Sequence, residues 1–168
     1  METGKTFKVA RAKPSDAEAV AAFVSQATRG RVMVPAHSVL ERFGAKGLWL
    51  VRDANGIIVG LAGWRAENLV ARIDDFLIYP LELYATAGSV LIENIEQAAQ
   101  ELQCEVSMVF LPLQASPTLT GFFERRGYSR PEMEGLPRAW RETVQEAMDR
   151  NRYTVMRQLR EDLVLRPM

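Results

Sequence analysis

Two features of the chain carry residue types that could take part in chemistry. Asp74 and Asp75 stand inside the otherwise apolar segment RIDDFLIYP. A carboxylate in such a strand is costly unless it is solvated, paired or functional, and a functional one could act as a general base. Because neighbouring strand residues face opposite sides, only one of the two can point to a given surface. A structural carboxylate paired with Arg65 or Arg72 is the alternative interpretation.

The second feature is the run of small residues after Pro80, in the segment YPLELYATAGSVL. At the start of a helix, small residues leave backbone N–H groups accessible, and the helix dipole places about half a positive charge there. Such a turn could hold a pyrophosphate without any basic side chain. The segment has one glycine and no lysine or arginine, and small residues also let a helix lie close to a sheet. Spacing alone favours this packing interpretation.

Composition limits the class of protein. The chain has 168 residues, 48% of them hydrophobic and 25% charged, as in a soluble globular protein of one domain. Lysine plus arginine and aspartate plus glutamate both number 21, which argues against a nucleic-acid or membrane partner held by bulk charge. The single Cys104 excludes an intrachain disulfide, and the single His37 leaves too few soft ligands for a zinc site.

The N-terminal segment lacks the apolar stretch of a signal peptide. No apolar run in the chain approaches the roughly 18 residues of a membrane-spanning helix. We therefore expect a cytoplasmic protein.

Periodicity predicts the elements that would position these residues. Strands are expected at 7–13, 47–53, 56–64, 68–80, 104–112 and 152–162. Helices are expected at 14–28, 35–44, 87–102, 116–127 and 135–151. Residues 53–56, Asp-Ala-Asn-Gly, predict a hairpin turn, and Ser15 with Glu18 has the spacing of a capping box.

Apolar stripes complete the prediction for two of the helices. One stripe is formed by Leu91, Ile95, Ala98 and Leu102, and the other by Trp140, Val144, Ala147 and Met148. Strands mixed with helices in this order indicate an α+β, or mixed α/β, fold with helices on both faces of a sheet.

Four segments in this order resemble the GNAT superfamily of acyl-CoA-dependent N-acyltransferases and cover nearly the whole chain. VARAKPSDAEAVAAFV is similar to the family's opening strand and helix, and WLVRDANGIIVGLAGW resembles its second and third strands. IDDFLIYP resembles its fourth strand, and GFFERRGYSR resembles its helix that ends in Tyr-x-x-x-Gly-Phe. The resemblance implies a single domain over 1–168 with a central mixed, mostly antiparallel sheet.

The resemblance also implies an activity and the residues that serve it. The family transfers an acyl group directly from acetyl-CoA, or another acyl-CoA, to an amine, here expected to be that of a small molecule. Asp74 falls where several members carry a glutamate that deprotonates the amine. The backbone groups expected to bind the cofactor belong to Leu77, Ile78 and Tyr79, and to Ala85, Thr86, Ala87, Gly88 and Ser89.

Three positions depart from the family's pattern. Leu83 stands where the family has arginine or glutamine, Thr86 where it has glycine, and Phe123 where many members have a tyrosine that protonates the thiolate. Phenylalanine cannot donate a proton, although a thiolate with a pKa near ~8.5 leaves with little help. These departures leave open a second hypothesis, a module that keeps the fold for binding or regulation without activity.

Residues 129–151 are longer than the family's usual closing hairpin and are expected to hold a helical insertion. Its amphipathic helix, which carries Trp140, could cover the acceptor site, extend the core or form a homodimer contact. Extension of the core is the simplest of these interpretations.

Overall fold

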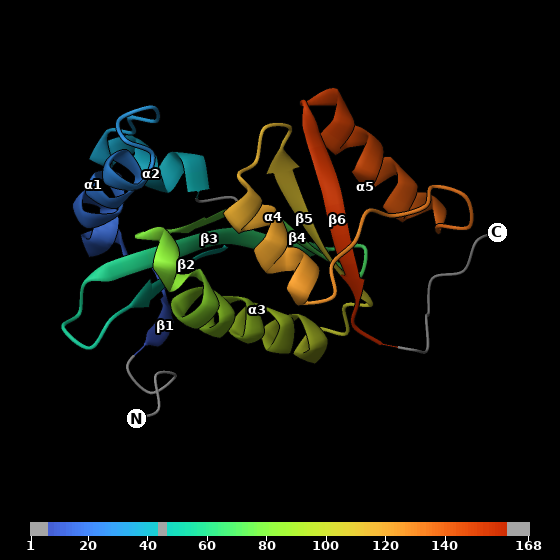
Figure 1. Ribbon diagram of the computed structural model, residues 1–168, viewed down its shortest axis with the longest axis horizontal. Coiled ribbons are helices and arrows are strands. Elements are labelled where there is room, and N and C mark those ends of the chain that lie inside the picture. Colours follow the sequence, from blue (N-terminus) through green and yellow to red (C-terminus); the bar gives the residue numbers. More distant parts are fainter. Residues whose placement is uncertain (1–6, 44–46, 161–168) are drawn as a thin grey trace. The chain divides into compact units, whose positions relative to one another are not determined.

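The computed structural model of the chain describes residues 7–43 and 47–160 (Figure 1). In these residues six strands form one sheet in the order β1-β2-β3-β4-β5-β6. The strands are β1 (Lys8–Arg11), β2 (Gly47–Arg52), β3 (Ile58–Glu67), β4 (Val70–Ile78), β5 (Val106–Pro112) and β6 (Arg152–Gln158). β4 and β5 pair in parallel, whereas β1 with β2, β2 with β3 and β5 with β6 pair antiparallel. The predicted mixed, mostly antiparallel sheet is therefore confirmed.

Five α-helices lie among the described residues, and each falls in a segment predicted to be helical. They are α1 (Ala17–Ala27), α2 (Ala36–Phe43), α3 (Ser89–Glu101), α4 (Pro117–Arg125) and α5 (Arg138–Asp149). The predicted end of the second helix at Gly44 lies outside the described residues. In the part of the chain that is described, no helix has both the length and the apolar character needed to cross a membrane.

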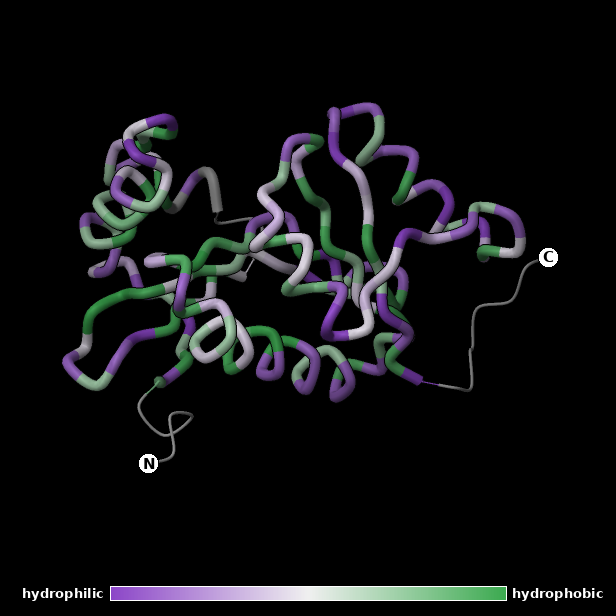
Figure 2. Tube along the Cα trace, in the orientation of Figure 1, coloured by the Kyte–Doolittle hydropathy of each residue, from purple (hydrophilic) through white to green (hydrophobic). Residues whose placement is uncertain are grey.

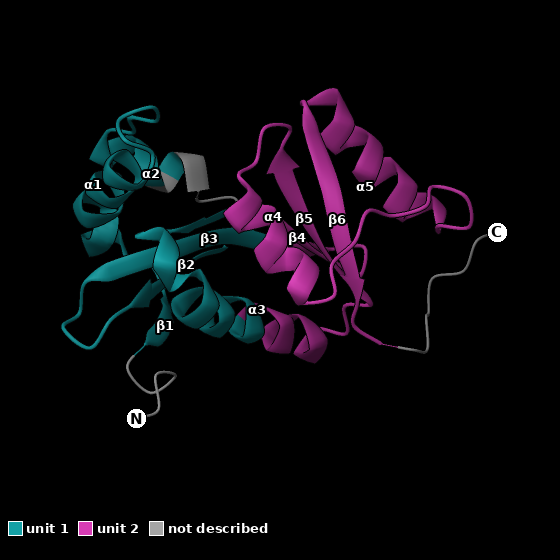
Figure 3. Ribbon diagram, in the orientation of Figure 1, with its two compact units in different colours: residues 1–64, 75–94 teal, residues 65–74, 95–168 magenta. Residues whose placement is uncertain are grey.

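The chain divides into two compact units (Figure 3). Unit 1 comprises residues 1–64 and 75–94, and unit 2 comprises residues 65–74 and 95–168. β4 and α3 contribute residues to both units. The expectation of a single domain over the whole chain stays a prediction.

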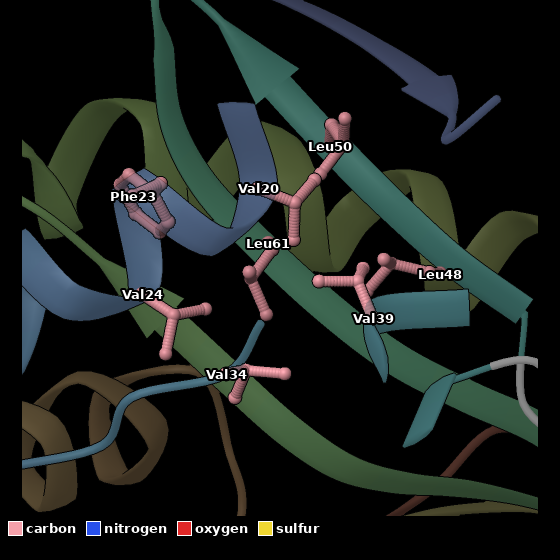
Figure 4. Packing of buried hydrophobic residues seen from close by; sticks show 8 residues of the cluster. All are labelled: Val20, Phe23, Val24, Val34, Val39, Leu48, Leu50 and Leu61. Atoms are coloured by element: carbon pink, nitrogen blue, oxygen red, sulfur yellow. The ribbon is translucent and has the colours of Figure 1, made fainter. Parts of the chain in front are cut away.

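Unit 1 has a core in which α1 and α2 cover β2 and β3. Eight buried apolar residues form it (Figure 4): Val20, Phe23, Val24, Val34, Val39, Leu48, Leu50 and Leu61. Leu77 and Tyr79, from β4 and the residue after it, pack against the same cluster. The end of β4 is thereby fixed to the α1 side of unit 1.

Unit 2 has helices on both faces of β5. On one face, α5 packs its buried residues against the strands, in a cluster of Val70, Val106, Met108, Phe110, Trp140, Val144 and Ala147. On the other face, the side chain of Ser107 lies 2.8 Å from the hydroxyl of Tyr128, which also bonds to Glu96 of α3. In this unit α5 therefore extends the core, as the simplest interpretation predicted.

The β2–β3 hairpin confirms the turn predicted at residues 53–56. The N–H of Gly56 donates to the carbonyl of Asp53 at 3.0 Å, and Gly56 has a φ of 80°. The Asp53 carboxylate also accepts the N–H groups of Asn55 and Ile57 at 2.9 and 3.0 Å. Local turn chemistry is thus sufficient to set this connection.

The start of the first helix differs from the prediction of a capping box by Ser15 and Glu18. The N–H of Lys13 donates to the Asp16 carboxylate at 2.7 Å, and the N–H of Asp16 donates back to the Lys13 carbonyl at 2.8 Å. A 3-10 turn over Pro14–Asp16 precedes α1. The reciprocal contact therefore forms before the position that the spacing indicated.

Both predicted apolar stripes were wrong at their last residue. Leu102 is 57% exposed and Met148 is 54% exposed. α3 ends at Glu101, and Gln103 has a φ of 69°, so Leu102 lies beyond the helical face. The buried residues of α3 and its preceding turn are Tyr84, Ala87, Gly88, Leu91, Ile92, Ile95, Glu96 and Ala99; Figure 2 shows the alternation of apolar and polar positions along this helix.

Gly60 of β3 is the position where close approach requires glycine. A Cβ there would lie 2.5 Å from Cδ1 of Ile78, 2.7 Å from Cγ1 of Val51 and 3.2 Å from the Leu77 carbonyl oxygen. We expect Gly60→Ala to displace the end of β4 and to lower the free energy of unfolding by about 1–3 kcal/mol, as overpacking does. Denaturant titration measures this change.

The matched control for Gly60→Ala is Gly121→Ala in α4. A Cβ at Gly121 would meet only the guanidinium end of Arg125, at 3.2 Å. That group can move, and alanine favours helix over glycine by about 1 kcal/mol. Equal stability of Gly60→Ala and wild type would contradict the overpacking argument.

Candidate functional site

The predicted cofactor turn follows β4 directly and is helical from its first residues. A 3-10 helix spans Leu81–Leu83, a π-helix spans Tyr84–Gly88, and α3 begins at Ser89. Helical geometry therefore starts earlier than Ala87, where periodicity placed it. π-Helical turns are rare and frequently occur at functional sites.

The turn has backbone N–H groups that its own helix does not satisfy. The N–H groups of Leu83 and Tyr84 donate to the carbonyls of Pro80 and Leu81. A π-helix pairs each N–H with the carbonyl five residues earlier, so a π-helix beginning at Tyr84 supplies no acceptor for the N–H groups of residues 85–87. These three groups lie at the start of the π-helix, and a helix start is where proteins often hold anions.

Side chains around these N–H groups are small. Ala85 is exposed, and Thr86 and Ser89 are half-buried, whereas Ala87 and Gly88 are buried. The Thr86 hydroxyl donates to the Leu83 carbonyl at 3.4 Å. The π-helical part of the turn thus presents backbone and small side chains with no lysine or arginine, and the exposed Glu82 precedes it.

The end of β4 holds the other predicted backbone groups, and two of them already have partners. The N–H of Tyr79 donates to the carbonyl of Val59 in β3 at 2.9 Å. Successive groups of a strand alternate between paired and unpaired edges, so the N–H of Ile78 points away from β3. That N–H bonds to the hydroxyl of Tyr84.

Tyr84 is a functional candidate that the sequence did not indicate. Its side chain is 6% exposed, and its ring lies 6.4 Å from that of Phe76. Burial raises the pKa of Tyr84 above its ordinary value, and the hydrogen bond from Ile78 lowers it in part. A tyrosine in a predicted turn has no periodic signal, so only the folded chain brings Tyr84 and Ile78 together.

Asp74 and Asp75 lie in β4 and are half-buried. Their suggested partners are engaged with glutamates: Arg65 with Glu67 at 3.3 Å, and Arg72 with Glu67 at 3.1 Å. Arg72 also bonds to Glu146 at 3.2 Å. Asp74 belongs to unit 2 and the turn to unit 1, so its role beside the turn stays a prediction.

Phe123 is buried in unit 2, between Phe122 and Tyr128. The ring centroids are 5.0 Å and 5.2 Å from that of Phe123, both in edge-to-face geometry. The Tyr128 hydroxyl donates to Glu96 at 2.7 Å and lies 2.8 Å from the Ser107 hydroxyl. Burial and the Glu96 charge raise the pKa of Tyr128 well above its ordinary value, so this hydroxyl is a protonated member of the core.

Cys104 is a core residue and His37 is a surface residue. Cys104 is fully buried, and burial raises the pKa of its thiol, which opposes a nucleophilic role. His37 is exposed on α2. Among residues 7–43 and 47–160, no group of three or more His, Cys, Asp or Glu side chains could hold a metal ion.

Comparisons with known proteins bear on the fold. No family model and no curated protein matches the chain. A GNAT-family acetyltransferase of Staphylococcus aureus has a TM-score of 0.68 at 13% identity, covering 92% of this chain and 99% of its own.

Two further solved structures contain a bound ligand. A putative acetyltransferase of Salmonella typhimurium, yncA, contains acetyl-CoA; it has a TM-score of 0.66 at 12% identity, covering 97% of this chain and 98% of its own. N-acetylglutamate synthase of Neisseria gonorrhoeae contains coenzyme A and N-acetyl-glutamate; it has a TM-score of 0.67 at 17% identity, covering 92% of this chain and 35% of its own. At these low sequence identities, the structural similarity shows that the chain shares the fold of these proteins.

Proposed function

From the GNAT fold of this chain, we propose that it transfers the acyl group of acetyl-CoA, or another acyl-CoA, to the amine of a small molecule. The observation that carries the proposal is the turn after β4. Its N–H groups at residues 85–87 have no acceptor in their own helix, and the side chains around them are small. Acetyl-CoA and coenzyme A in two structures of the same fold support this choice of ligand.

Acyl-CoA would supply the activated acyl group, and this chain's residues would bind and orient it. The N–H groups of residues 85–87 and the side chain of Ser89 would hold the pyrophosphate, as helix starts hold anions. The edge of β4 at Leu77, Ile78 and Tyr79 would orient the pantetheine arm. Asp74 would take the proton of the amine, directly or through a water.

The acceptor is proposed to be a small amine. The Neisseria gonorrhoeae structure contains N-acetyl-glutamate, an acylated small amine. Catalysis would come mainly from positioning the amine against the thioester and from polarising its carbonyl. The net charge of zero agrees with a small acceptor rather than a polyanion.

Calorimetric titration of the purified protein with acetyl-CoA, and separately with CoA, tests the proposed function. We expect saturable heat and a rise in Tm with either ligand. A thiol-release assay with a panel of small amines then identifies the acceptor. No heat and no thermal shift with millimolar ligand would contradict the proposal.

The second candidate function is a binding or regulatory module, favoured by Leu83, Thr86 and Phe123. Leu83 places an apolar, half-buried side chain where the family resemblance implies arginine or glutamine, and Phe123 has no hydroxyl. Binding of acetyl-CoA without turnover of any amine would support this second function over the first.

Restoring a basic side chain at position 83 is expected to strengthen acetyl-CoA binding. A charge-assisted hydrogen bond contributes about 1.5–3 kcal/mol, so Leu83→Arg should lower the Kd about 10- to 100-fold. Calorimetry measures the change. The control is Leu81→Arg, which adds the same charge two positions earlier at a side chain that is 52% exposed. If Leu83→Arg and Leu81→Arg lowered the Kd for acetyl-CoA equally, position 83 would make no specific contact with the cofactor.

A further inference from the structure

Arg72 of β4 is a buried arginine whose ion-pair partners are both exposed to solvent. Its side chain is 4% exposed and bonds to Glu67 at 3.1 Å and to Glu146 of α5 at 3.2 Å, whose side chains are 44% and 61% exposed. The guanidinium carbon of Arg72 lies 5.5 Å from the centre of the Phe110 ring. These residues all belong to unit 2. A carboxylate on a flexible, exposed side chain therefore reaches a cation inside this unit.

Two polar atoms beside Phe110 have no hydrogen-bond partner among the described residues, Nε of Arg72 and Oγ1 of the buried Thr154. Thr154 stands opposite Phe110 in the β5–β6 pair, and Arg72 stands opposite Met108 in the β4–β5 pair. Residues directly opposite in paired strands project to the same face, and Met108 and Phe110 face α5. Both atoms therefore lie between the sheet and α5, where an unpaired polar group is costly and calls for a ligand or a water.

The chemistry of these two groups selects an acceptor of hydrogen bonds. The guanidinium of Arg72 can only donate, and the hydroxyl of Thr154 can donate one hydrogen. A carboxylate offers two oxygens that accept such bonds, and it pairs with arginine through short, charge-assisted contacts. One ligand carboxylate would satisfy both groups.

Glu146 is the partner that such a ligand would replace. In the described chain Arg72 is its one ion-pair partner, whereas Glu67 also pairs with Arg65, at 3.3 Å. An exposed carboxylate moves into water at small cost, but loss of an anion beside buried Arg72 leaves its charge uncompensated. Exchange of Glu146 for a ligand carboxylate keeps the charges balanced, whereas a neutral ligand would not.

We propose that the acceptor amine also bears a carboxylate, which Arg72 and Thr154 bind in place of Glu146. This inference rests on the proposed function, because Asp74, the proposed base, lies two residues beyond Arg72 in β4. Two residues of a strand advance it by about 6.6 Å, which a small amino acid can span between its nitrogen and its carboxylate. The acceptor class is therefore an amino acid, and Glu146 is an internal competitor for its site.

The test titrates the full chain, in the presence of CoA, with amino acids from glycine to 6-aminohexanoate, each beside its own carboxamide. The carboxamide keeps the amine and the size but has no negative charge. We expect the acid of at least one pair to bind about 10-fold or more tightly than its amide, as for a charge-assisted hydrogen bond. Equal affinity in every pair, or no binding of any acid, would overturn the inference.

Thr154→Val removes the hydroxyl and keeps the branched shape of the side chain. We expect it to raise the Kd of the preferred acid by about 10-fold or more, and to leave the Kd of the amide unchanged. The control is Thr143→Val in α5, where the hydroxyl already donates to the Ala139 carbonyl at 3.0 Å. A thermal melt checks folding, and a purely structural Thr154 predicts an unchanged Kd. That result would overturn the inference.

Glu146→Gln removes the competing charge from Arg72. The Kd of the same acid should fall by about 2- to 5-fold, the upper figure being equivalent to the ~1 kcal/mol of an exposed ion pair. Glu142→Gln, about one turn earlier on α5, is the matched control, because its carboxylate is 63% exposed and pairs with Arg138 at 3.1 Å. Equal or weaker binding of the acid by Glu146→Gln would contradict competition by Glu146 and overturn the inference.

The failure of this inference is distinguishable from the failure of the proposed function. If CoA binds and the carboxamides are acetylated as efficiently as the acids, the carboxylate site is overturned and the proposed function stands. If the acids bind with the expected pattern among the variants while neither acetyl-CoA nor CoA binds, the carboxylate site stands and the proposed function is overturned.

Discussion

Replacing Asp74 with asparagine is expected to lower kcat for amine acetylation by about 100-fold or more at neutral pH, as on removal of a general base. Affinity for acetyl-CoA should be unchanged, because the proposed cofactor contacts come from the β4 end and the turn after it. Asparagine keeps the shape of the side chain and cannot take a proton. Steady-state kinetics with the best amine of the panel measures the loss.

The pH profile separates a base from a merely structural carboxylate. Alkyl amines with pKa values near ~10.4 are mostly protonated at neutral pH. As the pH rises toward that value the amine loses its proton to solvent, so the defect of Asp74→Asn should shrink. Asp75→Asn, which makes the same change at the next residue of β4, serves as the control. Equal turnover by Asp74→Asn and wild type at every pH would remove Asp74 from the mechanism.

Replacing Glu96 with alanine is expected to lower the free energy of unfolding by about 3 kcal/mol, near the lower end for breaking a buried ion pair. The carboxylate accepts the Tyr128 hydroxyl at 2.7 Å and Arg157 at 3.1 Å, and Arg126 at 3.4 Å. Its loss would leave the buried Tyr128 hydroxyl in contact with Ser107 but without this carboxylate, and would deprive both guanidinium groups of the same anion. We expect a loss at the lower end of the range because the Arg157 side chain is 42% exposed, so that solvent screens its charge.

Denaturant titration measures this change, with Glu101→Ala as the control at an exposed position of the same helix. Surface substitutions of that kind change stability by about 0.5 kcal/mol or less. The loss of stability in Glu96→Gln should lie between those of Glu96→Ala and the control. The amide oxygen can still accept a hydrogen bond from the Tyr128 hydroxyl, but it has no charge to pair with the arginines. A loss in Glu96→Ala no larger than in Glu101→Ala would show that the cluster is not stabilising.

Sequence predicted the elements that have local causes. The turn at residues 53–56 formed because Asp53 and Gly56 supply the side-chain acceptor and the positive φ that a hairpin needs. The long apolar segments became β4 and β5, and the order of elements was sufficient to indicate the sheet. The resemblance placed the cofactor turn after Pro80, where the structure has an unusual helical start.

Contacts between residues that are far apart in the sequence could not be predicted by the same reasoning. Glu96 sits in a helix rich in polar residues, and nothing in its spacing shows that Tyr128 and Arg157 meet it in the folded chain. The end of α3 was misjudged at Leu102 because periodicity does not register the positive φ of Gln103. Tyr84 was also missed, because its partner Ile78 lies across a turn whose irregular geometry periodicity does not predict.

The π-helical turn at Tyr84–Gly88 also makes the site sensitive to chain length rather than to side-chain identity. Such a turn holds one residue more than an α-helical turn. Removing one residue inside it would let an ordinary α-helix begin earlier, with α3 keeping its face toward the sheet. Tyr84 would then rotate by about 100° around the helix axis, the angle between successive residues. A deletion at Ala85 would thus turn the phenol away from Ile78 although Tyr84 and Ile78 themselves stayed in the sequence.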